Sequence, residues 1–157
     1  MKRIVCLILL ASAALAQSVD YAARSKVYLA RRDYVRAEQD ARLAVQKAPS
    51  SGDAHRLLGT VYTLRGNYAG AVTEFQTAVR LNPRDANAYY NLGIVYFKQN
   101  KLADSVRALS EAVRLNPKDA AAFEYRATVY QKQGNAKAAE ADRLTAASLK
   151  KKTEVLR

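Results

Sequence analysis

Residues 86–119 read ANAYYNLGIVYFKQNKLADSVRALSEAVRLNPKD, and the rest of the chain is built as a variation on this stretch. Its first half places residues at offsets of three, four and seven, which lie on one face of a helix: Tyr89, Leu92, Gly93 and Tyr96. A second helical pattern begins at Leu102, and Pro117 ends it because proline cannot continue a helix. The stretch therefore predicts a hairpin of two short helices, each with one apolar face.

The same residue types recur every 34 residues. The tyrosines in register are Tyr28, Tyr62, Tyr96 and Tyr130, and the prolines are Pro49, Pro83 and Pro117. Small residues keep the interval in both helices: Ser25, Gly59, Gly93 and Ala127 in the first, Ala37, Ala71, Ser105 and Ala139 in the second. Such residues let two helices approach closely. A fixed period of this size indicates stacked hairpins, each burying its apolar face against its neighbours.

This pattern resembles the tetratricopeptide repeat, a 34-residue helix-turn-helix unit. The stretch quoted above fills all eight family positions with suitable residues: Tyr89, Leu92, Gly93, Tyr96, Ser105, Leu109, Ala112 and Pro117. The resemblance implies an all-α, right-handed solenoid of four stacked helical hairpins, with eight helices and the last one extended. The four repeats are expected at about 18–51, 52–85, 86–119 and 120–153.

The first repeat departs from the family pattern at two positions. Arg24 takes the place of a leucine, and Ala41 takes the place of a large residue in the second helix. A terminal repeat with one side facing water is expected to lose apolar bulk in this way. The alternative is that residues 17–31 are partly disordered.

The fourth repeat departs from the pattern as well. Arg126 takes the leucine position, and Lys151 stands where the proline should be, so the last helix is expected to continue toward Val155. Residues 150–152 are three lysines near the end of that helix. They form either a solvated helix end or a patch that binds anions.

The start of the chain has the features of a secretory signal peptide. Two basic residues precede the apolar run 4–10, and small residues at Ala14 and Ala16 supply a cleavage pattern. We expect a signal peptide at 1–16, a repeat domain at 17–157, and a periplasmic or secreted protein. The alternative is an uncleaved membrane anchor, although the apolar run is shorter than the roughly 20 residues of a spanning helix.

Cleavage would change the chemistry that the chain offers. It would remove Lys2, Arg3 and the only cysteine, leaving 24 basic and 14 acidic residues from the original 26 and 14. The net charge would fall from +12 to +10. His55, the only histidine, falls at a packing position and makes no zinc site alone. Without a thiol, a second histidine or a glycine-rich phosphate loop, we expect no cofactor and no enzyme activity.

The resemblance implies that the first helices of successive repeats line a concave groove that binds a peptide or a partner segment. Carried onto this chain, the groove residues of the second repeat are Arg56, Thr60, Thr63 and Leu64. Those of the third are Asn87, Tyr90, Ile94, Phe97 and Lys98, and those of the fourth are Glu124, Thr128, Gln131 and Lys132. Lys26 and Leu29 are the nearest equivalents in the first. Some family members bind a C-terminal carboxylate with lysines, asparagines and an arginine at fixed groove positions. In this chain Asn91 matches one of these positions, whereas the residues at the others mostly do not: Arg56, Thr60, Ala121 and Tyr125.

Tyr90, Ile94 and Phe97 form a second apolar face on their helix. This face is either buried against the flanking first helices or exposed as an anchor in the groove. In the second case, Lys98, Lys132 and Arg56 would surround it with positive charge and favour an acidic or C-terminal segment.

The function predicted from the sequence is a protein–protein interaction scaffold in the cell envelope or outside the cell. The alternative is a basic protein that associates with anionic envelope polymers or lipids at a membrane surface, without spanning the membrane. Nucleic acid is disfavoured as a partner because acidic residues are interspersed among the basic ones and no stacking platform is evident. The sequence does not select an oligomeric state.

Overall fold

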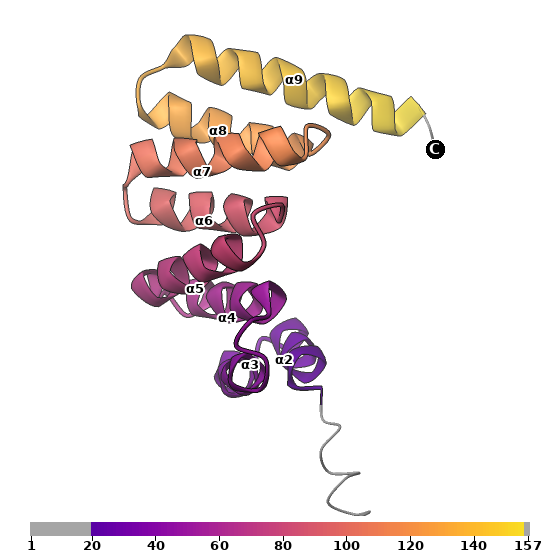
Figure 1. The fold of residues 1–157 in the computed structure, drawn as a ribbon. Coiled ribbons are helices and arrows are strands. Elements are labelled where there is room, and N and C mark those ends of the chain that lie inside the picture. Colours follow the sequence, from indigo (N-terminus) through magenta and orange to yellow (C-terminus); the bar gives the residue numbers. More distant parts are fainter. Residues whose placement is uncertain (1–19, 156–157) are drawn as a thin grey trace, which may run out of the picture.

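The computed structural model describes residues 20–155, and these residues form eight α-helices and no strand. Figure 1 shows the helices stacked in chain order. Their bounds are α2 Tyr21–Ala30, α3 Tyr34–Lys47, α4 Gly52–Leu64, α5 Tyr68–Leu81, α6 Ala86–Lys98, α7 Leu102–Leu115, α8 Ala120–Lys132 and α9 Ala136–Val155. The predicted all-α stack of helical hairpins is confirmed.

Local sequence signals set the helix ends. Ser51 and Asp85 precede α4 and α6, and each side chain accepts a hydrogen bond from a backbone N–H of the first turn. The turn inside every hairpin contains one residue with positive φ, at positions 34 residues apart: Arg32, Gly66, Asn100 and Gly134. Glycine and asparagine tolerate this left-handed backbone best, and they hold three of the four positions.

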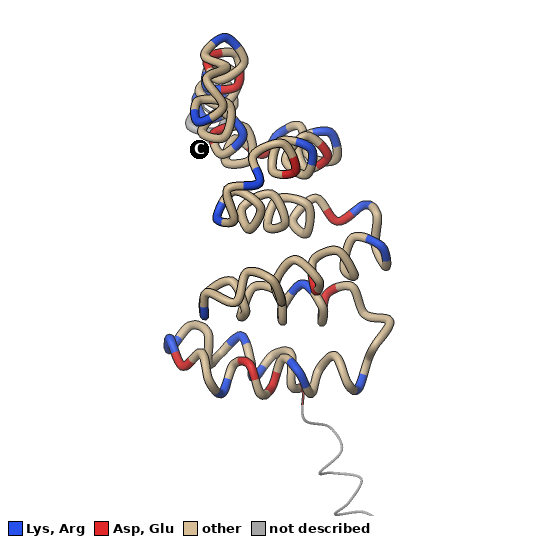
Figure 2. Tube along the Cα trace, turned by 90° about the vertical axis from the view of Figure 1, so that its left-hand side faces the viewer, with Lys and Arg blue, Asp and Glu red and all other residues tan. Residues whose placement is uncertain are grey.

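The helices contact one another in a repeating order. Within each hairpin the two helices pack together, and the second helix of each of the first three hairpins packs against the first helix of the next. The first helices α2, α4, α6 and α8 also contact each other in succession, whereas no contact joins the second helices within residues 20–155. The first helices therefore lie closer to one another than the second helices do. Figure 2 shows the same stack turned by 90°, with basic and acidic residues along its whole length.

The small residues in register form the contact between the two helices of each hairpin. A Cβ added at Gly93 would lie 2.6 Å from Cγ of Leu109, so this glycine permits the close approach of α6 and α7. In the same hairpin the buried Ser105 hydroxyl donates a 2.7 Å hydrogen bond to the Gly93 carbonyl. In the first hairpin the roles are exchanged, and Ser25 donates to the Ala37 carbonyl at 2.8 Å.

The first hairpin has an open side. Val27 of α2 is 49% exposed, whereas its counterparts in the next three hairpins, Val61, Val95 and Val129, are at most 1% exposed. The difference arises because each later first helix packs against the preceding second helix, and no described residue covers α2 in this way. Residues 21–30 form α2, so the alternative of disorder over 17–31 is wrong for that part.

The last helix is extended, as predicted, with 20 residues in α9 against 14 in α7. The predicted signal peptide at 1–16 lies outside the described residues. No helix among residues 20–155 is long and apolar enough to cross a membrane.

Candidate partner-binding groove

The apolar stripe on α6 joins an aromatic cluster that reaches α8. The Tyr125 ring stands 6.0 Å from the Tyr90 ring and 5.7 Å from the Phe97 ring, measured between centroids, and both pairs are edge-on. All three rings are half-buried. The two interpretations of the stripe are therefore both partly right, because α8 covers one side of it and the other side stays open.

The environment raises the pKa of both phenols in this cluster above the ordinary tyrosine value, at which a phenol is already neutral at physiological pH. Burial raises the pKa of Tyr90, and the negative charges of Asp119 and Glu124 raise it further. Burial likewise raises the pKa of Tyr125. Both hydroxyls therefore stay protonated at physiological pH and can donate hydrogen bonds to a ligand.

Positive charge lies next to the cluster at one end. The ammonium of Lys132 stands 4.9 Å from the centroid of the Phe97 ring, within the range of a cation–π contact. Lys98, which ends α6, is exposed. These two lysines make the end of the cluster near the hairpin turns suitable for a negatively charged group.

Other expected groove residues already have partners inside the protein. Arg56 pairs with Asp53 at 2.6 Å and with Asp85 at 2.8 Å, so its charge is largely offset. Glu124 pairs with Lys150 of α9 at 2.5 Å. The hydroxyls of three expected residues each donate to the carbonyl four residues earlier in their own helix: Thr60, Thr63 and Thr128.

A hollow of about 190 Å³ lies between α4 and α6. Thr60, Thr63 and Leu64 line it from α4, Asn91 and Ile94 line it from α6, and Phe75 of α5 also borders it. Leu64 is half exposed, so the hollow presents an apolar wall next to two hydroxyls. The structure thus brings together residues expected from the second and third repeats.

The remaining expected residues neither line this hollow nor belong to the aromatic pairs. Asn87, Gln131 and Lys26 are exposed and Leu29 is half-buried on α2. Tyr125, in contrast, is central to the cluster, although the sequence singles it out only as a clamp position with an unsuitable residue and not as part of an aromatic cluster. Its aromatic character is visible in the sequence, but its position between Tyr90 and Phe97 depends on how α8 packs against α6.

The histidine and the acidic residues make no metal site in the part of the chain that the structure describes. Nδ1 of His55 lies 2.6 Å from Oε2 of Glu74, and Nε2 lies 3.0 Å from the Pro49 carbonyl oxygen. His55 therefore ties α4 to α5 and to the end of the preceding hairpin.

Comparison with known proteins identifies the repeats. A family model described as TPR repeat matches residues 59–100, and one described as tetratricopeptide repeat matches residues 86–119. Among curated proteins, none matches this sequence.

Several solved structures share the fold. The crystal structure of MamA has a TM-score of 0.82 and 20% identity, covering 91% of this chain and 86% of that one. YrrB, described as a TPR protein with an unusual peptide-binding site, has a TM-score of 0.73 and 23% identity, covering 82% and 66%. An O-GlcNAc transferase of Thermobaculum terrenum has a TM-score of 0.67 and 26% identity, covering 70% of this chain and 21% of that one.

These similarities agree with the architecture derived from the chain itself. The stack of hairpins, the 34-residue period of small and aromatic residues, and the two matching family models all describe the same unit. Residues 59–119 therefore consist of tetratricopeptide repeats.

Proposed function

We propose that this protein is a non-enzymatic interaction scaffold that binds a segment of a partner protein in the groove lined by α4, α6 and α8. The observation that carries the proposal is the half-open aromatic cluster of Tyr90, Phe97 and Tyr125. Aromatic side chains that are held rigid and only partly covered are typical anchors of protein interfaces. The family and the peptide-binding site described for YrrB support the same class of partner.

The chemistry of the groove favours a particular kind of segment. An apolar side chain of the partner would bury the exposed side of the aromatic cluster, and a carboxylate of the partner would pair with Lys98 and Lys132. The neighbouring hollow by Leu64 and Ile94 has room for a second apolar side chain. We therefore propose a segment with two apolar residues and an acidic residue or a free C-terminus.

Peptides selected from a random library against the protein provide the test. A fluorescent copy of the best peptide is titrated against the protein and against Tyr90→Ala/Phe97→Ala, with anisotropy as the readout. We expect at least tenfold weaker binding to the double variant, because it removes two of the three rings.

A matched variant separates the groove from the general surface. Leu81→Ala/Leu144→Ala removes two exposed apolar side chains outside the groove and should leave the affinity unchanged. Circular dichroism confirms that both variants are folded. Equal affinity of a folded Tyr90→Ala/Phe97→Ala variant would reject the groove as the binding site.

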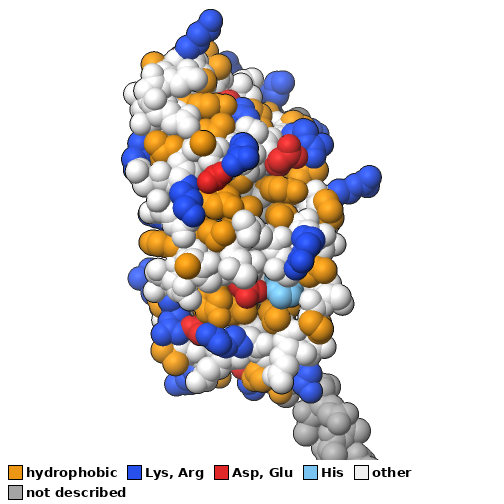
Figure 3. Space-filling model, turned by 60° about the vertical axis from the view of Figure 1, so that its left-hand side comes forward, with side chains coloured by type: hydrophobic (Ala, Val, Ile, Leu, Met, Phe, Trp, Pro, Cys, Tyr) orange, Lys and Arg blue, Asp and Glu red, His pale blue; other side chains and the backbone are white. Residues whose placement is uncertain are grey.

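The alternative of a basic surface that binds anionic polymers or lipids has less support. Within the described part of the chain, ten basic side chains lie within 4 Å of a carboxylate: Arg24, Arg36, Arg42, Arg56, Arg65, Arg107, Arg114, Arg126, Arg143 and Lys150. Figure 3 shows a face on which acidic and basic groups lie next to one another between apolar areas. Salt-sensitive binding to acidic vesicles would favour this alternative, because screening weakens interactions between exposed charges.

We also propose that the scaffold acts after export, on the strength of the signal-peptide pattern at 1–16. The full chain expressed with a C-terminal tag should be recovered from the envelope or the medium. N-terminal sequencing should then begin at Gln17. Recovery with Met1 retained would instead favour an uncleaved segment.

A further inference from the structure

One position of the repeat separates the third hairpin from the other three. The second helix of the first, second and fourth hairpins has an acidic residue there: Asp40, Glu74 and Asp142. Each of these acids pairs with a cationic or imidazole group from the first helix of its own hairpin. The third hairpin has Ala108 at this position.

The three pairs link the two helices of their hairpins. Arg126 donates to both carboxylate oxygens of Asp142 at 2.8 Å, and Arg24 binds Asp40 in the same way at 2.6 and 2.7 Å. In the second hairpin, His55 and Glu74 link α4 to α5. The pairing group thus changes between hairpins while the position of the acid stays fixed.

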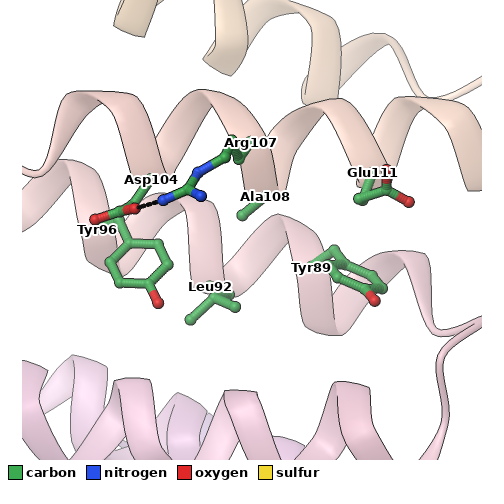
Figure 4. A pocket seen from close by; sticks show the side chains of 7 residues that line it. All are labelled: Tyr89, Leu92, Tyr96, Asp104, Arg107, Ala108 and Glu111. Carbon is green, nitrogen blue, oxygen red and sulfur yellow. Dashed lines mark hydrogen bonds and ion pairs between the residues drawn. The ribbon is translucent and has the colours of Figure 1, made fainter.

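The third hairpin has a hollow at the same positions instead. Leu92 stands in place of the arginine and Ala108 in place of the acid, and together they form the floor of a hollow of about 320 Å³. Figure 4 shows Tyr96 with Asp104 at one end of this hollow and Tyr89 with Glu111 at the other. The hollow therefore has aromatic walls and a carboxylate at each end.

The fourth hairpin shows what such walls accommodate. Its arginine, Arg126, lies over the rings of Phe123 and Tyr130, with 5.6 and 5.8 Å from the guanidinium carbon to the ring centroids. These two rings occupy the positions of Tyr89 and Tyr96. The third hairpin has both aromatic walls but Leu92 in place of this arginine, and the guanidinium that lines its hollow is that of Arg107 on α7, paired with Asp104.

The two carboxylates at the ends of the hollow are specific to the third hairpin. The corresponding residues in the fourth are Ala138 and Thr145, and neither the first nor the second hairpin has an acid at either position. Asp104 and Glu111 now pair with Arg107 and Arg114 of their own helix. Both arginines are more than half exposed, and exposed pairs of this kind contribute little, so an incoming cation can replace them.

We propose that the hollow between α6 and α7 binds an arginine side chain of a partner protein, with its guanidinium against Tyr89 and Tyr96 and paired with Asp104 or Glu111. An arginine stem would lie on Leu92 and Ala108, which suits its apolar methylene groups. The site lies on the face of α6 that carries Tyr89, Leu92 and Tyr96, whereas the groove cluster uses Tyr90 and Phe97. It is therefore distinct from the groove.

The probe is the peptide acetyl-Ala-Arg-Ala-amide, titrated into isotope-labelled protein and followed by amide chemical shifts. We expect saturable shifts confined to α6 and α7, with a millimolar dissociation constant. Peptides with lysine or norleucine in place of arginine should bind at least threefold more weakly, because neither presents a planar guanidinium to the rings. Equal binding of the norleucine peptide would show an apolar pocket and overturn the proposal, as would the absence of saturable shifts with arginine.

Two variants test the location. Leu92→Arg/Ala108→Asp installs the pair of the fourth hairpin and should fill the hollow, with at least a tenfold loss of peptide binding. Asp104→Asn/Glu111→Gln keeps the shape of the hollow and should weaken binding about fivefold, whereas Glu140→Gln on α9 should not. If Leu92→Arg/Ala108→Asp does not fold, Asp104→Asn/Glu111→Gln still tests the proposal. Unchanged peptide binding to that variant would contradict the role of the carboxylates.

Discussion

The first and fourth hairpins share an arginine–aspartate pair between their two helices that the two intervening hairpins lack. Both place an arginine where the middle hairpins have leucine, and both bind it to an aspartate sixteen residues later. They differ in exposure, because the Arg24 side chain is 47% exposed and the Arg126 side chain 16%. In the fourth hairpin, Ser110 of α7 also accepts a hydrogen bond from Arg126.

The same hairpin backbone therefore accommodates either an apolar pair or an ion pair between its two helices. The contribution of an ion pair to the free energy of unfolding depends on how far the rest of the stack buries it. A charge that is covered by protein depends on its partner, whereas one that faces water can be hydrated instead. Removing one partner of the pair should therefore cost most stability in the fourth hairpin, less in the second and least in the first.

The largest effect is expected at the fourth hairpin. Asp142→Ala would leave Arg126 without its carboxylate in a mostly buried place, and we expect a loss of about 3 kcal/mol in the free energy of unfolding. Urea denaturation followed by circular dichroism measures it. The double variant Arg126→Leu/Asp142→Ala, which copies the third hairpin, should come within about 1 kcal/mol of the wild type. A double variant as unstable as the single one would contradict this explanation.

A smaller effect is expected at the second hairpin. His55→Ala removes both hydrogen bonds of the imidazole and leaves Glu74 largely covered without its partner. We expect a loss of about 1–2 kcal/mol in the same urea experiment. Thr73→Ala, an exposed change one residue before Glu74, serves as the control. An unchanged unfolding midpoint for His55→Ala would mean that the pair adds nothing to stability.

The smallest effect is expected at the first hairpin. Asp40→Ala leaves Arg24 free to be hydrated, because about half of that side chain already faces water. Its shift in the urea midpoint should be smaller than that of His55→Ala and much smaller than that of Asp142→Ala. The reverse order would show that the exposure of the cationic side chain does not govern how much these pairs contribute to the free energy of unfolding.

Much of the fold could be predicted from the chain because its signals are local. The helix caps at Ser51 and Asp85, the turn residues Gly66 and Gly134, and the 34-residue period act within a few residues of where they stand. The groove could be predicted only in part. Tyr90 and Phe97 were recognisable as a second apolar face, but Tyr125 between them was not.

The sequence by itself determined the all-α class, the two-helix unit and its repetition, because helix periodicity, capping and small residues at close contacts are properties of short stretches. Only the tertiary structure decided which side chains fill the space between helices. The pairing of Arg126 with Asp142, the place of Tyr125 and the open hollow at Ala108 all depend on how far apart neighbouring helices lie. The distance between the two helices of one hairpin results from side chains far apart in its sequence, and the distance from α6 to α8 depends also on how neighbouring hairpins stack.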